Sequence, residues 1–573
     1  MASRDIKIQA NVAVPMRDGT LLRADIYRPD TDQPAETLVV RLPYDKSQAG
    51  LATLLDPIRF AGNGYAVVVQ DCRGCFTSDG DFYPWRDDAT DGYDTIEWAA
   101  AQHWSNKKVG MYSGSYLGSV QWMAARERPP HLLAIAPMVA PTSLRNLFYR
   151  NGVFQLKSAQ LWSLMMLGAH ALRHHPPAEL PGLMQEILDA MDNMGRQAGY
   201  LPLKAWPLGK KSKFLGFYFD FLEHPTNDEY WRQLEFAGYE KTRVPAYIWA
   251  GWYDAVTESG ALSSYIEMKT RGGAEHARKN VKLIVGPWAH DPEFKQKVGE
   301  IDFGIRSSGG AADPNGALLR WFDYWLKGKE NGIMDEPPVR LFIMGDNVWR
   351  NENEWPLART QYTNYYLHSG GKANGSGGDG LLSPELAANE PPDTFDYDPL
   401  NPVPSLGGRL LGEAGALDQG EIERRKDVLV YSTQPLVSDV EVTGLLTMKL
   451  HAQSSAPDTD FTAKLVDVWP NGKAFIVADG IVRARYRNSD KTPSFIEPDK
   501  SYEYTIDLVA TSNVFKAGHR IRLEVSSSNF PKYDRNPNTG HAIGVDAETQ
   551  VATQKIFHDS KRPSHVVLPV IPR

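Results

Sequence analysis

The chain has 573 residues, of which 42% are hydrophobic and 23% charged, and its formal net charge is −8. A chain of this length is too long to fold around a single hydrophobic core, because such cores stop growing at about 250–300 residues. We therefore expect two or three packed units. The ordinary composition excludes a disordered or fibrous chain, and the mild acidic charge without a long basic run argues against a nucleic-acid partner.

The beginning of the chain gives no sign of export. Residues 1–19 are polar and interrupted by charge, and they lack the apolar core of a secretory signal. No later stretch approaches the roughly 20 apolar residues that span a bilayer, and two cysteines are too few for a disulfide framework. We therefore expect a cytoplasmic protein with no membrane partner.

The first part of the sequence alternates short apolar runs with helical patterns, which is typical of a mostly parallel sheet covered by helices. The strands are expected at 38–41, 65–70, 109–113 and 135–139, and the helices at 88–102 and from Tyr116 onward. From about 141 to 241 no strands are expected. Apolar residues recur there at helical spacing, as in 161–171 and 183–194. We interpret this segment as a helical cap inserted into an α/β unit.

Strand patterns return in the second half of the chain. They lie at 246–250 and 282–285, and a helix at 318–326 and a strand at 339–344 close the α/β unit. A Gly-, Ser-, Asn- and Pro-rich stretch at 368–384, continued through Pro404, marks a change of composition. Beyond it, alternating runs predict an all-β sandwich, at 428–431, 445–452, 463–468, 474–483 and 521–525.

The expected strand at 109–113 runs directly into a helix through Ser113-Gly114-Ser115-Tyr116. A serine in such a tight turn is held in a strained backbone conformation that lifts its hydroxyl above the sheet, and it needs small neighbours. Ser115 is therefore the candidate nucleophile, although Ser113 replaces the usual glycine and the next glycine, Gly118, comes one residue late. The backbone N–H of Tyr116 is the candidate oxyanion donor.

Two further residues complete a catalytic triad in the order that α/β-hydrolases use. Asp254 follows the strand at 246–250 and a Gly turn, and His290 follows the strand at 282–285 and a Gly-Pro turn. His290 would take the proton of Ser115 and pass it to the leaving group. Asp254 would hold the imidazole in the correct tautomer and stabilise its charged form.

A C-x-x-C spacing, Cys72 to Cys75, follows an expected strand rather than opening a thioredoxin-like unit. The pair also offers only two of the four ligands of a structural zinc. A structural or incidental role is expected for both cysteines.

An acidic series invites a calcium interpretation, because it resembles part of an EF-hand loop. Its members are Asp87, Asp88, Asp91 and Asp94. Trp98 stands where the bidentate glutamate of such a loop belongs, so the pattern fails at its strongest ligand. We expect the carboxylates to cap and complement the following helix. No metal and no cofactor are expected.

Longer segments resemble the bacterial cocaine esterase group of the CocE/NonD hydrolases, which is related to X-Pro dipeptidyl peptidases and α-amino acid ester hydrolases. The segments include VPMRDGTLLRADIYRPD, RLPYDKS, SYLG, AGWYD, VGPWAH, DTDFTAKLVDVWP and SSSNFPKYDRN. The resemblance implies an α/β-hydrolase core at 1–141 and 242–355, a helical cap at 142–241 and a C-terminal jelly-roll β domain at 356–573.

The resemblance also implies an oxyanion hole that combines the Tyr116 N–H with the phenol of the tyrosine in RLPYDKS. That tyrosine is Tyr44, and a neutral phenol at the end of the strand at 38–41 can donate a hydrogen bond to an oxyanion.

Three residues are expected in the substrate pocket. Trp162 matches an aromatic position of the group. Val256 stands where the group has an aromatic residue that encloses an aryl acyl group, and Leu411 with Gly412 stands where it has a bulky apolar pair. An acyl group of a different shape is therefore expected.

The preferred hypothesis is a serine carboxylesterase that cleaves small-molecule esters of bulky, aryl or cyclic acyl groups through an acyl-enzyme intermediate. The alternative is an amide-cleaving relative: an acylase, an X-Pro dipeptidyl peptidase or an α-amino acid ester hydrolase. A remote alternative is a catalytically inactive carbohydrate-binding protein, which would have lost a triad member. Relatives also suggest a homodimer.

Overall fold

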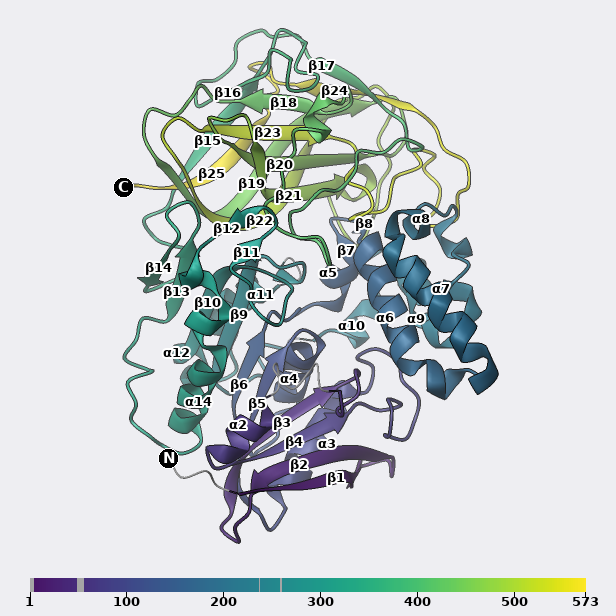
Figure 1. Ribbon diagram of the computed structural model, residues 1–573. Helices are drawn as coiled ribbons and strands as arrows, with labels where there is room; N and C mark the ends of the chain where they lie inside the picture. Colours follow the sequence, from purple (N-terminus) through teal and green to yellow (C-terminus); the bar gives the residue numbers. More distant parts are fainter. Residues whose placement is uncertain (1–4, 49–55, 237, 258–259) are drawn as a thin grey trace.

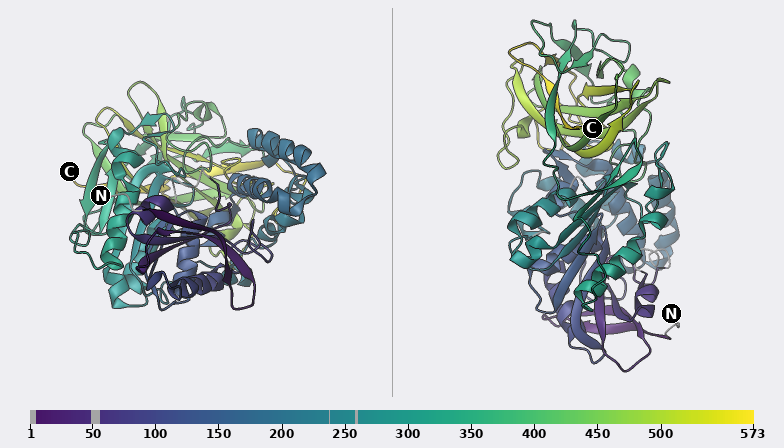
Figure 2. Two further views of the ribbon diagram at one scale, coloured as in Figure 1. Left: turned by 60° about the horizontal axis from the view of Figure 1, so that its bottom comes forward. Right: turned by 90° about the vertical axis from the view of Figure 1, so that its left-hand side faces the viewer.

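The computed structural model describes residues 5–48, 56–236, 238–257 and 260–573. Figure 1 shows three parts: an α/β core, a helical cap at one side of it, and a β-rich part at the opposite end from the N-terminus. The side view in Figure 2 shows an elongated molecule in which this C-terminal β unit is stacked on the other two parts.

The α/β core is built on a ten-stranded sheet in the order β1-β2-β4-β3-β5-β6-β9-β10-β13-β14. Its strands are β1 (Ile6–Pro15), β2 (Leu21–Pro29), β3 (Ala35–Leu42), β4 (Tyr65–Asp71), β5 (Ser105–Gly114), β6 (Leu132–Met138), β9 (Ala246–Tyr253), β10 (Val281–Ala289), β13 (Val339–Ile343) and β14 (Val348–Glu352). The strands from β4 to β13 in this order run parallel, whereas β1, β2 and β14 pair antiparallel at the edges. The predicted mostly parallel sheet is confirmed.

Helices cover both faces of this sheet. Successive side chains of a strand point to opposite faces, and in the buried strands both sets are apolar, so both faces must be shielded from water. Leu38 of β3 packs in the same apolar cluster as Phe322, whereas its neighbour Val39 packs with Trp122. The helices of the core are α2 (Pro57–Gly62), α3 (Asp88–Ala100), α4 (Tyr116–Arg126), α11 (Ala261–Arg271), α12 (Glu275–Lys279), α13 (Gly309–Ala312) and α14 (Pro314–Trp325). A hairpin of β11 (Lys297–Val298) and β12 (Ile301–Asp302) lies between α12 and α13 in the chain.

The helical cap lies between β6 and β9. Its helices are α5 (Leu144–Phe148), α6 (Leu156–His174), α7 (Leu180–Asp192), α8 (Met194–Ala198), α9 (Gly216–Glu223) and α10 (Glu229–Gln233). The expectation that no strands occur here is wrong at one place, where β7 (Tyr149–Arg150) and β8 (Val153–Phe154) form a hairpin. Strands of two residues are too short to produce a detectable alternation of apolar and polar residues.

The C-terminal β unit is an eleven-stranded sheet whose strands pair mostly antiparallel. Its strands are β15 (Gln361–His368), β16 (Leu381–Ser383), β17 (Asp393–Tyr397), β18 (Leu429–Ser432), β19 (Val440–Ser454), β20 (Asp460–Val468), β21 (Ala474–Arg483), β22 (Tyr502–Phe515), β23 (Arg520–Ser526), β24 (Ala552–Phe557) and β25 (His565–Ile571). In its apolar core, the rings of Phe461 in β20 and Tyr504 in β22 pack with their centroids 4.8 Å apart. The prediction that this part of the chain consists of β-strands is confirmed. One strand, β16, lies within residues 368–384, the Gly- and Ser-rich stretch that we interpreted as the boundary before this part.

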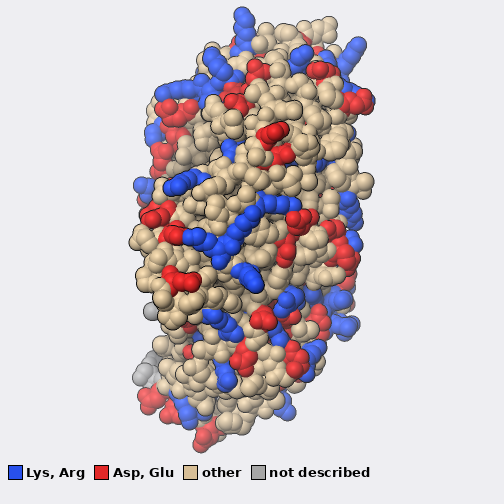
Figure 3. Space-filling view, turned by 90° about the vertical axis from the view of Figure 1, so that its right-hand side faces the viewer, with Lys and Arg blue, Asp and Glu red and all other residues tan. Residues whose placement is uncertain are grey.

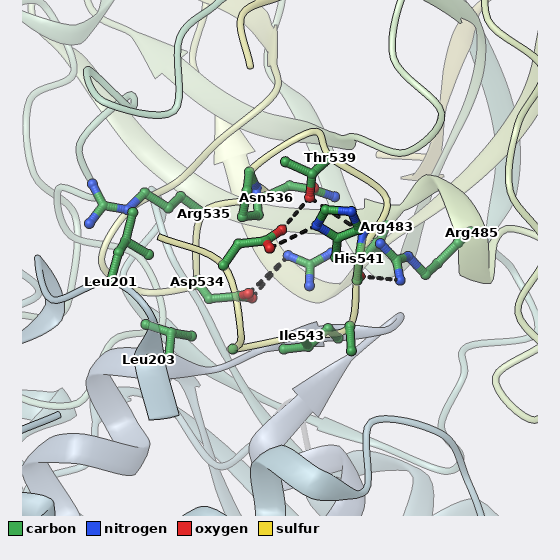
Figure 4. Close-up of a pocket in the computed structure, with 14 residues that line it drawn as sticks. Leu201, Leu203, Arg483, Arg485, Asp534, Arg535, Asn536, Thr539, His541 and Ile543 are labelled. Carbon is green, nitrogen blue, oxygen red and sulfur yellow. Dashed lines mark hydrogen bonds and ion pairs between the residues drawn. The ribbon is translucent and has the colours of Figure 1, made fainter. Parts of the chain in front are cut away.

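A buried ion-pair network of the C-terminal β unit lies against the cap. Arg483 donates to both carboxylate oxygens of Asp460 at 2.8 Å and to Asp534 at 3.1 Å. Figure 4 shows Arg483 and Asp534 facing each other in a pocket that Leu201 of the cap also lines. Asp534 also accepts the backbone N–H of Phe154 in β8 at 2.9 Å. Asp534 therefore connects the buried ion pairs of the C-terminal β unit to the hairpin of the cap.

The surface has a mixed charge. Figure 3 shows lysine and arginine side chains interspersed with aspartate and glutamate over the face that it displays. Within the described ranges, none of the helices combines the length and the apolar character needed to cross a membrane.

The backbone is strained at two serines, one at the end of β5 and one at the start of α4. Ser113 has a φ of 101° and Ser115 a φ of 59°, both in the region that favours glycine. A Cβ atom at Gly118 would lie 2.4 Å from the Cβ of Ala140. The glycine three residues after Ser115 therefore lets α4 approach the segment that follows β6.

Replacing Ser113 with glycine is expected to stabilise the protein by about 1 kcal/mol, because it relieves the positive φ. The urea midpoint of unfolding, followed by tryptophan fluorescence, would be compared for Ser113→Gly and Ser113→Ala. Alanine removes the buried hydroxyl, which has no hydrogen-bond partner among the described residues, but keeps the strained Cβ. We expect glycine to be the more stable variant. The opposite order, which is normal at unstrained positions, would show that this residue is not strained.

Candidate active site

Four side chains lie in loops at the carboxyl ends of parallel strands. Ser115 follows β5, Asp254 follows β9 and His290 follows β10. Tyr44 follows β3, the neighbour of β5 in the sheet. Parallel strands present their carboxyl ends at one edge of a sheet, which is where α/β proteins place their sites.

The three residues predicted as a triad form a continuous chain of contacts. His290 Nε2 lies 3.0 Å from Ser115 Oγ, and His290 Nδ1 lies 3.0 Å from Asp254 Oδ2. Asp254 is fully buried, and its Oδ1 also accepts the backbone N–H of Val256 at 2.7 Å. The carboxylate only accepts, so it favours a proton on Nδ1 and leaves Nε2 as the acceptor for the serine hydroxyl.

The electrostatics of this chain favour a basic imidazole. Burial lowers the pKa of His290, but the charge of Asp254 and its hydrogen bond outweigh burial, so the pKa lies above the ordinary value of 6.5. An imidazole with a raised pKa is a better acceptor for the proton of a nucleophile.

The start of α4 supplies backbone donors next to Ser115. Ser115 is the N-cap of this helix and Tyr116 is its first residue. The first N–H groups of a helix have no acceptor within the helix, so the Tyr116 N–H is available to an anion at Ser115.

Tyr44 is held at the same site by both the core and the cap. Its loop is fixed to the core by Lys46, whose Nζ lies 2.8 Å from Asp71 Oδ2 and whose backbone N–H donates to Oδ1 at 2.9 Å. On the other side, Trp162 Nε1 donates to the Tyr44 hydroxyl oxygen at 3.0 Å. Burial raises the pKa of the Tyr44 phenol, which therefore keeps its proton and can donate it.

The side chain of Tyr116 connects the nucleophile turn to buried charges. Its hydroxyl donates to Asp88 Oδ2 at 2.6 Å, and Asp88 Oδ1 lies 2.9 Å from the guanidinium of Arg41 in β3. Asp88 and Asp91 lie in the first turn of α3, as expected for carboxylates that complement the helix start, but the expectation of a cap is wrong for Asp88, whose carboxylate binds Tyr116 and Arg41. The N-cap residue Asp87 likewise makes no capping hydrogen bond with its side chain.

The rest of the acidic series also forms ion pairs instead of caps. Asp91 lies 2.6 Å from Arg73, and Asp94 lies 2.7 Å from Arg17. Arginines from distant segments form ion pairs with these carboxylates. The preference of acidic residues for helix N-termini therefore could not predict their partners. Across the part of the chain that the structure describes, no group of three or more His, Cys, Asp or Glu residues could hold a metal ion.

A cavity of about 680 Å³ opens at Ser115 and His290. All three predicted pocket residues line it: Trp162 from α6, Val256 after β9, and Leu411 from the C-terminal β unit. The cavity is lined mainly by apolar side chains, which suits an uncharged, bulky group. Val256 and Leu411 are smaller than the aromatic side chains that also line the cavity.

Sequence reasoning missed several aromatic residues of this cavity. Trp85 and Phe148 line it together with Trp162. The rings of Trp85 and Trp162 are stacked with centroids 5.3 Å apart. Trp85 also donates its backbone N–H to the Tyr116 hydroxyl at 3.0 Å. It precedes α3 in a loop, where no periodic pattern could have marked it.

Among the described residues that line the cavity, Asp291 is the one carboxylate. Its Oδ2 lies 2.8 Å from Lys295 Nζ. An isolated carboxylate that is already paired offers little to a free ammonium group of a substrate.

Cys72 and Cys75 are free and buried in the core. Burial raises the pKa of both thiols well above the ordinary value, so neither has the thiolate character of a redox or nucleophilic cysteine.

Comparison with known proteins places the chain in a family. Residues 18–292 match the X-Pro dipeptidyl-peptidase (S15 family), and residues 331–567 match the X-Pro dipeptidyl-peptidase C-terminal non-catalytic domain. A cocaine esterase from Rhodococcus sp. (strain MB1 Bresler) is 42% identical, with full coverage of both chains.

Solved structures agree with this assignment. An α-amino acid ester hydrolase has a TM-score of 0.78 and 26% identity, over 99% of this chain and 97% of its own. An aminopeptidase from the marine sediment archaeon Thaumarchaeota archaeon shares the fold, with a TM-score of 0.79 and 24% identity over 100% of this chain and 97% of its own. The chain belongs to the cocaine esterase group of the CocE/NonD serine hydrolases.

Proposed function

We propose that the protein is a serine carboxylesterase that cleaves small-molecule esters of bulky, aryl or cyclic acyl groups. The observation that carries this proposal is the 3.0 Å contact between Ser115 Oγ and His290 Nε2 at the wall of a large, mainly apolar cavity. The 42% identity to a cocaine esterase over the whole chain supports the class of reaction.

Acylation would begin when His290 Nε2 accepts the Ser115 proton and Oγ attacks the ester carbonyl. The resulting oxyanion would accept hydrogen bonds from the Tyr116 N–H and the Tyr44 hydroxyl. When the tetrahedral intermediate collapses, the C–O bond to the alcohol breaks and the imidazolium returns the proton to the leaving oxygen. Asp254 would stabilise the imidazolium between these two steps.

Deacylation would repeat the sequence with water. His290 would remove a proton from a water molecule that attacks the acyl-enzyme carbonyl, and the same two donors would stabilise the second oxyanion. Collapse of this intermediate releases the carboxylic acid and returns the proton to Ser115 Oγ, so the enzyme is regenerated.

The walls of the cavity suggest the kind of acyl group. Trp85, Phe148 and Trp162, whose rings pack against one another, supply flat apolar surface, and the aliphatic side chains of Val256 and Leu411 also line the cavity. Relatives that bind a free α-amino group need a cluster of carboxylates at the mouth of the pocket. The described lining offers a single carboxylate, Asp291, which pairs with Lys295, and this favours the ester over the alternative.

The domain boundaries, the location and the oligomeric state are also part of the proposal. We propose that the core, cap and jelly-roll domain follow the boundaries 1–141 with 242–355, 142–241 and 356–573. A cytoplasmic location is supported by the two free, buried cysteines. A homodimer is supported only by the resemblance.

The esterase proposal predicts that turnover of p-nitrophenyl acetate, butyrate and benzoate exceeds that of the matching p-nitroanilides. Ser115→Ala should lower ester turnover by at least about 10³-fold, because the nucleophile is lost. Tyr44→Phe should lower it roughly 10²- to 10³-fold, because one oxyanion donor is lost. Steady-state kinetics would measure both. Ester turnover that survives Ser115→Ala would exclude this nucleophile, and preferential anilide cleavage would favour an amidase.

The raised pKa of His290 predicts the acidic limb of the pH profile. Protonated His290 cannot accept the Ser115 proton, so kcat/KM should fall as the pH drops through a pKa above 6.5. Asp254→Asn removes the charge that raises this pKa. The limb should then move to lower pH while kcat falls roughly 10⁴-fold. A wild-type limb below pH 6.5, or a limb that Asp254→Asn leaves in place, would contradict this assignment.

A further inference from the structure

Helix α6 of the cap contacts the Tyr44 loop at two points. Trp162 Nε1 donates to the Tyr44 hydroxyl oxygen at 3.0 Å, and His170 Nε2 lies 2.9 Å from the carbonyl oxygen of Pro43. The two side chains are eight residues apart, which is about two turns of helix. One helix therefore binds both the phenol and the peptide group that precedes it.

The Trp162 contact determines which way the phenol can donate. An indole N–H only donates, so the Tyr44 oxygen must be the acceptor of this hydrogen bond. The hydroxyl proton of Tyr44 then has to point elsewhere. Tyr44 lines the cavity with Ser115, and its proton is therefore left for an oxygen atom bound there.

The His170 contact has an equally fixed polarity. A carbonyl oxygen only accepts, so the proton of the imidazole is on Nε2. His170 is 2% exposed, and its Nδ1 has no hydrogen-bond partner in the described ranges. Burial lowers the pKa of His170 to about 4, so the ring stays neutral at pH 7. The rings of Phe76 and Phe214, at 4.6 and 4.9 Å, hold the imidazole in place.

The core contacts the Tyr44 loop in two ways. Lys46 binds Asp71 through its side chain and its backbone N–H, and the ring of Tyr116 packs edge-on against the Tyr44 ring, with centroids 6.3 Å apart. Neither contact is a hydrogen bond to the Tyr44 hydroxyl. Among the described residues, the hydrogen bonds to this hydroxyl and to the Pro43 carbonyl both come from α6.

We propose that Trp162 and His170 are positioning residues that aim the Tyr44 hydroxyl at the oxyanion, so that the cap completes the oxyanion hole. Trp162 acts on the phenol oxygen and His170 acts on the backbone of Pro43. This inference rests on the proposed function, because it presupposes that Tyr44 donates to the oxyanion.

A double-mutant cycle tests the role of Trp162. Trp162→Phe keeps an aromatic ring in the cavity but removes the N–H, and it should lower kcat/KM for p-nitrophenyl butyrate about 3- to 10-fold. The KM should change less than twofold. In the Tyr44→Phe background the same change should have no further effect, because the phenol that it positions is absent. Equal losses in both backgrounds would show that Trp162 is only a cavity wall and would overturn the proposal.

A matched pair of histidines tests the role of His170. His170→Phe keeps a ring among Phe76 and Phe214 but removes the donor, and it should also lower kcat about 3- to 10-fold. His170→Gln, which can place an N–H near the position of Nε2, should restore most of the activity. His174→Phe is the control. His174 lies one turn later on α6, and its ring packs against the same Phe214, with centroids 4.6 Å apart.

The proposal is overturned if His170→Phe and His174→Phe have equal effects, or if His170→Gln is no better than His170→Phe. Circular dichroism and thermal unfolding of each variant separate loss of folding from loss of positioning. If Tyr44→Phe alone leaves kcat/KM unchanged, the proposed oxyanion donor itself fails, whatever α6 does. That outcome is distinct from a cycle in which Tyr44 matters but Trp162 acts independently of it.

Discussion

The backbone of Ser115 is held at a φ of 59° between β5 and α4, and the site depends on this one strained residue. Such a conformation costs about 1–3 kcal/mol, so the surrounding packing must enforce it. The Ser115 N–H bonds to the carbonyl of Met138 at 3.0 Å, and Gly118 lets α4 approach Ala140 closely. The hydroxyl can then reach His290 while the N–H of the next residue stays free for an anion.

Buried charges and the two outer parts of the chain stabilise this arrangement. Asp88 accepts the hydrogen bond of the Tyr116 hydroxyl and is itself paired with Arg41. The helix start therefore cannot rotate without breaking a hydrogen bond to a buried charge, which is costly. The cap supplies α6, which holds Tyr44 from the other side. The C-terminal β unit supplies Leu411 to the cavity, and it is tied to the cap through Arg483 and Asp534. The cavity therefore needs all three parts.

The sequence predicted those features that depend on local rules. A buried strand followed by a small turn and a polar residue pointed to Ser115, Asp254 and His290, because strand ends in a parallel sheet share one edge. The local rule failed for Asp88, whose partner Arg41 lies 47 residues earlier in the chain. It also missed β15, which pairs with the last strand of the chain, and Trp85, a loop residue whose role in the cavity comes from long-range packing.

The central claim is that Ser115 is a nucleophile activated by His290. Incubation with a fluorophosphonate, followed by peptide mass spectrometry, tests it most directly, because this reagent forms a covalent bond with an activated serine. The account predicts one phosphonyl group on the peptide that contains Ser115, no such label in Ser115→Ala, and greatly slowed labelling in His290→Ala. A label on another serine, or labelling at an unchanged rate in His290→Ala, would contradict it.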